Sequence, residues 1–244
     1  MNNNLHIESN FGVFIGSFDN NQIHQHYAIQ WSIALSEPIE IKDEVSSTSF
    51  VESVLIKSNI THQFHCSGHH LLFLFSPISQ TGHFLQQQSH SGIAEYRNGW
   101  SKKLQSLGKN YLVGKLPFPD FITQTKEILE ELSYNDSNNN PVEDDRITKA
   151  LKFIEQNTDR VIPAHELAKY CHLSESRFLH LFKEKTNITY RQAQLWIKLS
   201  QSIPKLFKQK ITETAYEFGF SDSAHYSKVF KQNFGFSPRL FSKL

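Results

Sequence analysis

The chain has 244 residues, enough for one or two domains with substantial cores, and carries 25 basic and 24 acidic side chains. No segment is apolar enough to span a membrane, and the first residues lack the pattern of a secretory signal, so we expect a cytoplasmic protein. The two cysteines, Cys66 and Cys171, form no CxxC pair. This excludes a disulfide scaffold and a thiolate zinc site and is typical of a reducing compartment.

Charge divides the chain into two halves. Residues 1–140 carry 8 basic and 13 acidic side chains, a net charge of −5, whereas residues 141–244 carry 17 and 11, a net charge of +6. The polar, asparagine-rich stretch around 133–141 separates them and is typical of a linker. We therefore expect a first domain at 1–132, a linker at 133–143 and a basic domain at 144–244. The basic domain suits nucleic acid or another anionic surface.

The first domain shows the pattern of short strands. Tyr27 to Leu35 alternates apolar and small or polar residues, as in a half-buried strand. Leu71 to Phe75 is a continuous apolar run that ends before Pro77, which suits a central strand. With further segments at 11–18 and 50–56, this pattern predicts an all-β sandwich or barrel.

After about residue 93 the pattern becomes helical. An apolar stripe lies on one face of the helix expected around residues 121–132, formed by Phe121, Ile122, Thr125, Ile128, Leu129 and Leu132. The stripe suits packing against the β domain or the seam of a dimer, and the sequence leaves both open.

The second domain contains an internal repeat, in which segment 166–189 recurs in 213–237. Ser174 matches Ser221, 47 residues later, whereas Phe182 matches Phe230, 48 residues later. We therefore expect one extra residue inside the second long helix. Each copy predicts a short helix, a tight turn and a longer amphipathic helix, which is a helix-turn-helix motif.

Cap and turn residues mark these helices. Ser174 and Ser221 are expected N-caps of the long helices, because their hydroxyl groups accept from unpaired N–H groups. His172 and Gly219 are expected in the left-handed turns, and Asn187 and Gly235 after the long helices.

The long helix of each copy presents apolar residues inward and polar residues outward. The inward residues are Phe178, Leu181 and Phe182 in the first copy and Tyr226, Val229 and Phe230 in the second; the outward residues are Ser176, Arg177, His180 and Lys183, then Ser223, His225, Ser227, Lys228 and Lys231. A solvated face explains the outward lysines as well as contact with phosphate does. It is less adequate for His180 and Lys228, which occupy matching places.

The second motif, Gly219 to Lys231 followed by Phe234-Gly235-Phe236-Ser237-Pro238, closely resembles that of AraC/XylS-type bacterial transcription regulators. Leu167-Ala168 through Leu173-Ser174, with Phe182-Lys183, resembles their first motif, so the resemblance covers about residues 145–244. It implies seven helices, with two recognition helices in successive major grooves of DNA. It places Ser176, Leu179, His180, Ala224, Ser227 and Lys228 toward bases, and Arg177, Lys183, His225 and Lys231 toward the DNA backbone.

Three positions depart from the family pattern. The resemblance implies a long helix at about Thr189–Phe207 joining the two motifs, but Pro204 falls inside it. We expect a helix through Ile203, a bend at the proline and a short continuation before Ile211, because proline removes a hydrogen bond. Lys210 stands where an N-cap serine is usual, and Leu179 offers a base only apolar contact.

The first domain resembles the cupin-like sensor domain of the same family, through His24-x-His26 and the strand order. The resemblance implies an effector pocket at His24, His26, Gln30 and His62. His24, His26 and His62, with His65 as a further candidate, could instead ligate a metal, because an HxH on a strand puts both imidazoles on one face. That face lies opposite the apolar face of Tyr27 to Leu35, so the histidines point away from a core on that side unless a bulge intervenes. The third interpretation is that these are plain structural histidines, and the sequence leaves all three open.

The sequence therefore predicts an α+β protein with an N-terminal cupin-like β-barrel with flanking helices and a C-terminal all-α domain with two helix-turn-helix motifs. The predicted function is that of a transcription regulator, not an enzyme, that binds a double-stranded DNA operator as a monomer or homodimer. Its further partners would be a small-molecule effector and RNA polymerase, with no membrane and no cofactor. The alternative is a cupin-type metalloenzyme or metal sensor fused to the DNA-binding domain.

Overall fold

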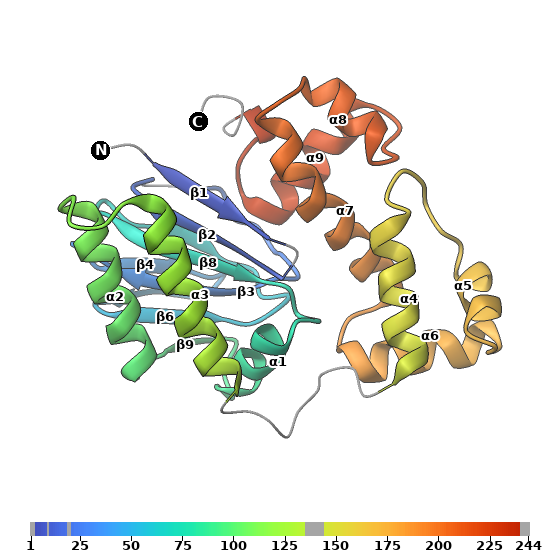
Figure 1. The fold of residues 1–244 in the computed structure, drawn as a ribbon, viewed down its shortest axis with the longest axis horizontal. Helices are drawn as coiled ribbons and strands as arrows, with labels where there is room; N and C mark the ends of the chain where they lie inside the picture. Colours follow the sequence, from blue (N-terminus) through green and yellow to red (C-terminus); the bar gives the residue numbers. More distant parts are fainter. Residues whose placement is uncertain (1–2, 9, 19–20, 135–143, 240–244) are drawn as a thin grey trace. The chain divides into compact units, whose positions relative to one another are not determined.

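The computed structural model describes residues 3–8, 10–18, 21–134 and 144–239. The chain divides into two compact units, Met1–Asn139 and Asn140–Leu244 (Figure 1). The predicted linker falls largely outside the described residues, and its first two residues belong to helix α3 (Phe118–Tyr134). Across the described ranges, no helix has the length and apolar character needed to cross a membrane.

The N-terminal unit contains two antiparallel sheets. The larger sheet has the strand order β1 (Asn4–Ile7), β2 (Phe11–Gly16), β8 (His70–Phe75), β3 (Ile29–Ala34), β6 (Ser53–Ile56) and β9 (Ile93–Glu95). The smaller sheet has the order β5 (Ser47–Phe50), β4 (Ile39–Lys42) and β7 (Gln63–His65). The central strand predicted at Leu71 to Phe75 is confirmed, because β8 pairs with β2 on one side and β3 on the other.

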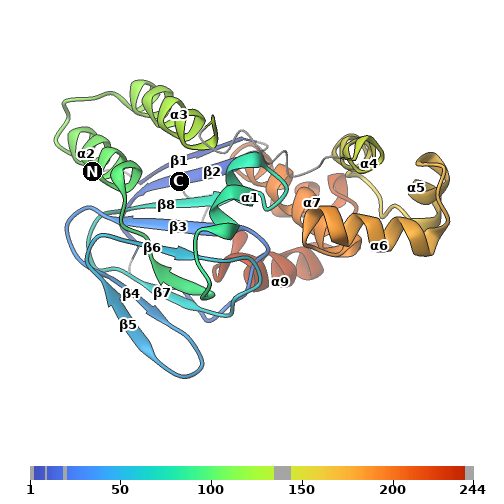
Figure 2. The ribbon, with the colours of Figure 1, turned by 90° about the horizontal axis from the view of Figure 1, so that it is seen from below.

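The two sheets do not close into the predicted barrel within the described part of the chain. In a closed barrel, the edge strands of the large sheet, β1 and β9, would be hydrogen-bonded to strands of the small sheet. Neither of them pairs with a strand of the small sheet. The chain instead leaves the large sheet after β3, forms β4 and β5, and returns at β6. The result is a β region with helices on one side and a second sheet on the other (Figure 2).

One face of the large sheet packs against helices. Ile29, Trp31 and Ile33 of β3 share a buried core with side chains from α1 (Gln80–Gln87), α2 (Gly99–Leu112) and α3 (Figure 1). The predicted stripe of α3 faces this core, with Phe121 fully buried and only Ile128 half-buried. The stripe therefore packs on the β region and is not a dimer seam.

The opposite face of the large sheet is also buried, because a second apolar core lies on that side. Ala34 of β3, Val54 and Ile56 of β6 and Ile41 and Phe64 of the small sheet belong to this core. All six residues of β3 are consequently buried. The face that carries Gln30 therefore lies opposite the helix-side core, as expected, but it is not exposed, because the small sheet covers it.

The regular structure of the C-terminal unit is helical throughout the described residues 144–239. Six α-helices occur among residues 144–239: α4 (Asp145–Gln156), α5 (Ala164–Tyr170), α6 (Glu175–Thr186), α7 (Tyr190–Leu206), α8 (Ile211–Glu217) and α9 (Ser223–Phe234). A 3₁₀ turn begins at residues 238–239, where the described part ends. The family resemblance implied seven helices, and the seventh is not among the described α-helices.

Helix α7 is the predicted connection between the two motifs. It begins after the N-cap Thr189 and ends before the C-cap Phe207, as the resemblance implied. Pro204 lies in its last turn with an exposed side chain, and the helix continues to Leu206 beyond it. The predicted short continuation past the proline is therefore confirmed.

Replacing Pro204 with alanine is expected to raise the free energy of unfolding by about 1–2 kcal/mol. The new N–H group would donate to the carbonyl of Ser200, which outweighs the extra freedom of the unfolded chain. Affinity for the preferred DNA site should not improve, because the orientation of the two motifs relative to each other depends on this helix. Urea unfolding and a duplex titration measure the two quantities. Lower stability would show that the proline suits a native helix boundary.

Candidate nucleic-acid interface

The two predicted helix-turn-helix motifs have the same turn. In the first, His172 has φ 55°, and in the second, Gly219 has φ 67°. The following residues donate back to the preceding helix in the same way, from Leu173 N to Ala168 O at 2.8 Å and from Phe220 N to Ala215 O at 2.9 Å. This is the hydrogen-bond pattern of a Schellman cap, so the left-handed residues predicted for both turns are confirmed.

The N-caps of the long helices differ from the prediction in one copy. Ser174 caps α6 and accepts from Arg177 N, as predicted. Helix α9 is capped by Asp222, whose carboxylate accepts from His225 N at 2.7 Å, so the prediction of Ser221 is wrong. An ionised carboxylate is the stronger acceptor for the first N–H groups of a helix, and Ser221 donates to Asp222 at 3.1 Å.

This shift places the extra residue of the second copy in the turn and not inside the helix. The short helices α5 and α8 begin at Ala164 and Ile211, whereas α6 and α9 begin at Glu175 and Ser223, one position further apart. The left-handed residues that end the long helices, Asn187 and Gly235, keep this wider spacing. The two long helices therefore match residue for residue along the chain, and His180 of α6 corresponds to Lys228 of α9.

The predicted contact residues lie on the outer faces of α6 and α9. Exposed side chains are those of Ser176, Arg177, Leu179, His180, Lys183, Ala224, His225, Lys228 and Lys231, while Ser223 and Ser227 are half-buried. On the inner faces Phe178, Leu181, Phe182, Tyr226 and Phe230 are buried and Val229 is half-buried. Both helices therefore expose a polar face to solvent and bury an apolar face in the core of the unit.

Several outer residues are held by local contacts. His180 Nδ1 lies 3.6 Å from the Glu184 carboxylate one turn later, and Ser227 Oγ donates to Ser223 O at 2.7 Å. Arg177, Lys183, Lys228 and Lys231 belong to no ion pair with another described residue. These four cations are therefore available for an external anion.

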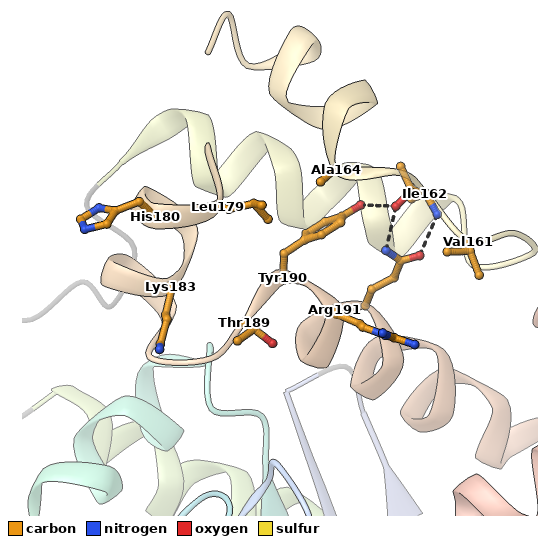
Figure 3. Close-up of a pocket in the computed structure, with 10 residues that line it drawn as sticks. Val161, Ile162, Ala164, Leu179, His180, Lys183, Thr189, Tyr190 and Arg191 are labelled. Atoms are coloured by element: carbon orange, nitrogen blue, oxygen red, sulfur yellow. Dashed lines mark hydrogen bonds between the residues drawn. The ribbon is translucent and has the colours of Figure 1, made fainter. Parts of the chain in front are cut away.

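A hollow of about 640 Å³ lies beside α6, at the start of α7. Leu179 and Lys183 line it from α6, and Thr189, Tyr190 and Arg191 line it from the beginning of α7 (Figure 3). Tyr190 donates to Ile162 O at 2.7 Å, and Gln194 exchanges two hydrogen bonds with the backbone of Ile162. These hydrogen bonds hold one wall of the hollow in place, and His180 of α6 also lines it (Figure 3).

Thr189 and Arg191 also line this surface, although the sequence pattern of the motifs did not predict them there. Thr189 and Gln192 form a capping box, since each side chain bonds to the backbone of the other. The pattern of threonine followed three residues later by glutamine marks a helix start and could have been recognised. It places exposed Arg191 in the first turn of α7, near the predicted contacts of α6.

In the N-terminal unit the structure brings together the four predicted pocket residues. His24 and His62 face each other across an isolated antiparallel bridge, with their ring centroids 4.4 Å apart. His26 lies 5.0 Å from His62 by ring centroids, and Gln30 Oε1 lies 3.1 Å from His26 Nε2 and 3.2 Å from His62 Nε2. All four side chains are buried, whereas His65 is exposed.

Residues 167–243 match the family model of a helix-turn-helix domain. The chain is 28% identical over 136 residues to an uncharacterised HTH-type transcriptional regulator of Pseudoalteromonas carrageenovora, covering 54% of this chain and 82% of that protein. It is 27% identical over 201 residues to the Msm operon regulatory protein of Streptococcus mutans, covering 81% of this chain and 65% of that protein. It is 23% identical over 189 residues to the transcriptional activator RhaS of Mannheimia succiniciproducens, covering 77% of this chain and 68% of that protein.

The full-length fold is similar to that of ToxT from Vibrio cholerae. An apo variant matches with a TM-score of 0.60 and 14% identity, covering 98% of both chains. Wild-type ToxT bound to an unsaturated fatty acid matches with a TM-score of 0.61 and 12% identity, covering 97% of this chain and 96% of ToxT. At these identities the likeness shows a common fold alone.

The chain has an N-terminal β region with helices, followed by two helix-turn-helix motifs in matching register. This combination defines a DNA-binding transcription regulator. The relatives of this chain are regulators of transcription. Residues 167–243 carry the helix-turn-helix domain of this family model, and the chain is similar to regulators of transcription.

Proposed function

We propose that α6 and α9 enter successive major grooves on one face of a double-stranded operator. The observation that carries this proposal is the common register of the two helices, which gives His180 and Lys228 the same position. Successive major grooves are about 34 Å apart, so a protein that reads both needs two similar helices on a rigid connection. Helix α7, capped at its start, supplies that connection.

Base contacts are proposed for Ser176, Leu179 and His180 of α6 and for Ala224, Ser227 and Lys228 of α9. A lysine donates to the O6 and N7 atoms of guanine, and an apolar side chain contacts the methyl group of thymine. Leu179 suits the second role, because it is a large apolar side chain left 37% exposed.

Backbone contacts are proposed for Arg177, Lys183, His225 and Lys231, with Ser223 at the first position of α9. These residues lie beside the base-reading set on the same two helices. Phosphate contacts supply most of the affinity and make it dependent on salt, whereas base contacts supply the sequence preference. Arg191, at the rim of the hollow, extends the same cationic surface.

The N-terminal unit is proposed to be a cupin-like sensor domain, at residues 1–132, joined by a linker at 133–143 to the DNA-binding domain at 144–244. The support is a buried polar cluster between two packed sheets. The similarly folded ToxT has been crystallised with an unsaturated fatty acid. A small-molecule effector of this domain would adjust how the regulator, as a monomer or homodimer, works with RNA polymerase in the cytoplasm.

The residues 141–244 are expected to fold alone and to bind duplex DNA at low salt, because the C-terminal unit has its own core. Gel-shift titration of this fragment and of the full chain tests the expectation. Selection of bound duplexes from a random pool then gives the operator. A fragment that folds, by circular dichroism, yet binds no duplex would contradict the assignment of DNA binding to this unit.

A further inference from the structure

The cluster of His24, His26, Gln30 and His62 lies between the two sheets, and backbone pairing positions it. His24 N donates to His62 O and His62 N donates to His24 O, each at 2.9 Å. Directly opposed residues of such a bridge project to the same face, so the two imidazoles meet. His26 lies two residues after His24, and Gln30 lies on the buried strand β3. Each of the three histidines has one ligating nitrogen within 4.8 Å of those of the other two.

The hydrogen bonds fix the tautomer of all three imidazoles. Each Nδ1 lies 2.9–3.0 Å from a backbone carbonyl oxygen: Gln22 O for His24, Ala28 O for His26 and Ile60 O for His62. A carbonyl oxygen only accepts, so every Nδ1 carries the proton. The Nε2 atom of a neutral imidazole then has a lone pair and no proton.

All three imidazoles are buried away from solvent. Neutral histidine is the form that ligates metals, and metal-binding histidines commonly donate their second nitrogen to a backbone carbonyl. The three rings therefore have the tautomer and the outer hydrogen bonds of metal ligands.

The fourth member of the cluster adds a lone pair at the same place. Gln30 Oε1 faces the Nε2 atoms of His26 and His62, while Gln30 Nε2 donates to Ser32 Oγ at 3.0 Å. Two imidazole lone pairs and a carbonyl oxygen repel one another unless a cation lies among them. The other solution is a rotated amide, in which the NH₂ group of Gln30 donates to both histidines.

We propose that His24, His26 and His62 bind a divalent first-row transition-metal ion through their Nε2 atoms, with Gln30 Oε1 as a further ligand. Imidazole donors suit zinc, copper, iron and nickel, whereas a set without carboxylates disfavours magnesium and calcium. Ligand nitrogens about 3.4 Å apart surround a tetrahedral zinc ion, so small side-chain rotations would close the site.

The test uses the full-length chain without a polyhistidine tag, stripped with EDTA and then titrated with Co²⁺ and Zn²⁺. We expect one equivalent of Co²⁺ per chain to produce visible absorption bands, and Zn²⁺ to displace it. A metal concentration of about 100 times the dissociation constant should raise the melting temperature by roughly 5–10 °C. Wild-type protein that binds no Co²⁺ and shows no thermal shift with Zn²⁺ would overturn the proposal.

Variants separate this site from the other histidines of the chain. His62→Gln is expected to weaken Co²⁺ binding by at least about 100-fold, since outer-shell changes alone cost 10–100-fold. The matched control is His70→Gln, because His70 is also buried, also bonds a carbonyl through Nδ1 and lies outside the cluster. Equal loss of binding in both variants would contradict the proposal. Because His62→Gln could unfold the chain, imidazole ¹⁵N shifts of wild-type protein, with and without Zn²⁺, provide a measurement free of substitution.

Gln30→Glu distinguishes the metal site from the rotated amide. In a metal site the carboxylate adds negative charge beside the cation, so Co²⁺ affinity should rise by about tenfold or more. In the rotated arrangement the substitution removes two donors, so it should lower the melting temperature and leave Co²⁺ affinity unchanged. The second result would overturn the role assigned to Gln30 and, with it, the proposed donor set.

Discussion

Gly219→Ala is expected to lower the free energy of unfolding by about 2–5 kcal/mol and to abolish tight DNA binding. Gly219 has φ 67°, a conformation that costs an alanine roughly 1–2 kcal/mol. An added methyl carbon would lie 2.7 Å from the carbonyl carbon of Asp159 and 2.9 Å from Lys198 Nζ. This overlap with backbone adds a further cost of about 1–3 kcal/mol.

The substitution acts on function because Asp159 precedes the first motif and Gly219 forms the turn of the second. If the added methyl group pushes the backbone of Gly219 away from that of Asp159, the orientation of α9 relative to α6 changes. Urea unfolding of the full chain and duplex titration measure the two effects. A variant with unchanged stability would contradict this prediction, because it would show that the backbone near Asp159 can move away from the added methyl group at little cost in free energy.

Two other glycines provide matched controls. Gly114 has φ 76° with no atom near its added carbon, so Gly114→Ala isolates the conformational cost of about 1–2 kcal/mol. Gly99 begins helix α2 and also has open space, so Gly99→Ala should cost nothing or stabilise slightly. The excess loss in Gly219→Ala over Gly114→Ala measures the steric contact with the Asp159 backbone.

Lys228→Ala is expected to cost about 1–3 kcal/mol on the preferred duplex and to relax the sequence preference at one base pair. Lys228 is exposed on α9 and has no ion-pair partner in the described part of the chain. Its ammonium group is therefore available to base edges. Affinity for the selected operator, and for variants with each base pair changed, gives the size and position of the effect. An unchanged sequence preference would show that the assigned register of α9 on DNA is wrong.

Lys231→Ala is the matched control, because it removes the same charge one turn later on the same helix. It is expected to weaken all duplexes alike and to reduce the salt dependence by about one phosphate contact. A position-specific effect of Lys231→Ala would exchange the proposed roles of the two lysines.

The sequence predicted the helix-turn-helix motifs well because their signals are local. The left-handed turn residues, the cap at Ser174 and the apolar inner faces act over a few residues along the chain, and the structure confirms them. The cap of α9 was misplaced by one residue because Ser221 and Asp222 are both competent caps. Only the backbone torsions of the folded turn select Asp222, and that selection sets the common register of α6 and α9.

In the N-terminal unit, the sequence located four of the nine described β-strands, β2, β3, β6 and β8, but not the environment of their faces. Alternation along β3 identified the face that packs on the helices, which begin much later in the chain, at Gln80. It could not reveal that the small sheet, formed by β4, β5 and β7, covers the other face. Burial of a strand face depends on what the rest of the chain brings against it.

The histidine cluster shows the same division. The spacing of His24 and His26 predicted a shared face, because side chains alternate along an extended chain. The meeting of His24 with His62 depends on a backbone pairing between distant parts of the chain, and the burial of both depends on the packing of two sheets. The sequence by itself therefore determined a regulator with two helix-turn-helix motifs. The tertiary structure alone decided that three buried imidazoles converge, because long-range pairing and solvent exclusion arise only when the chain has folded.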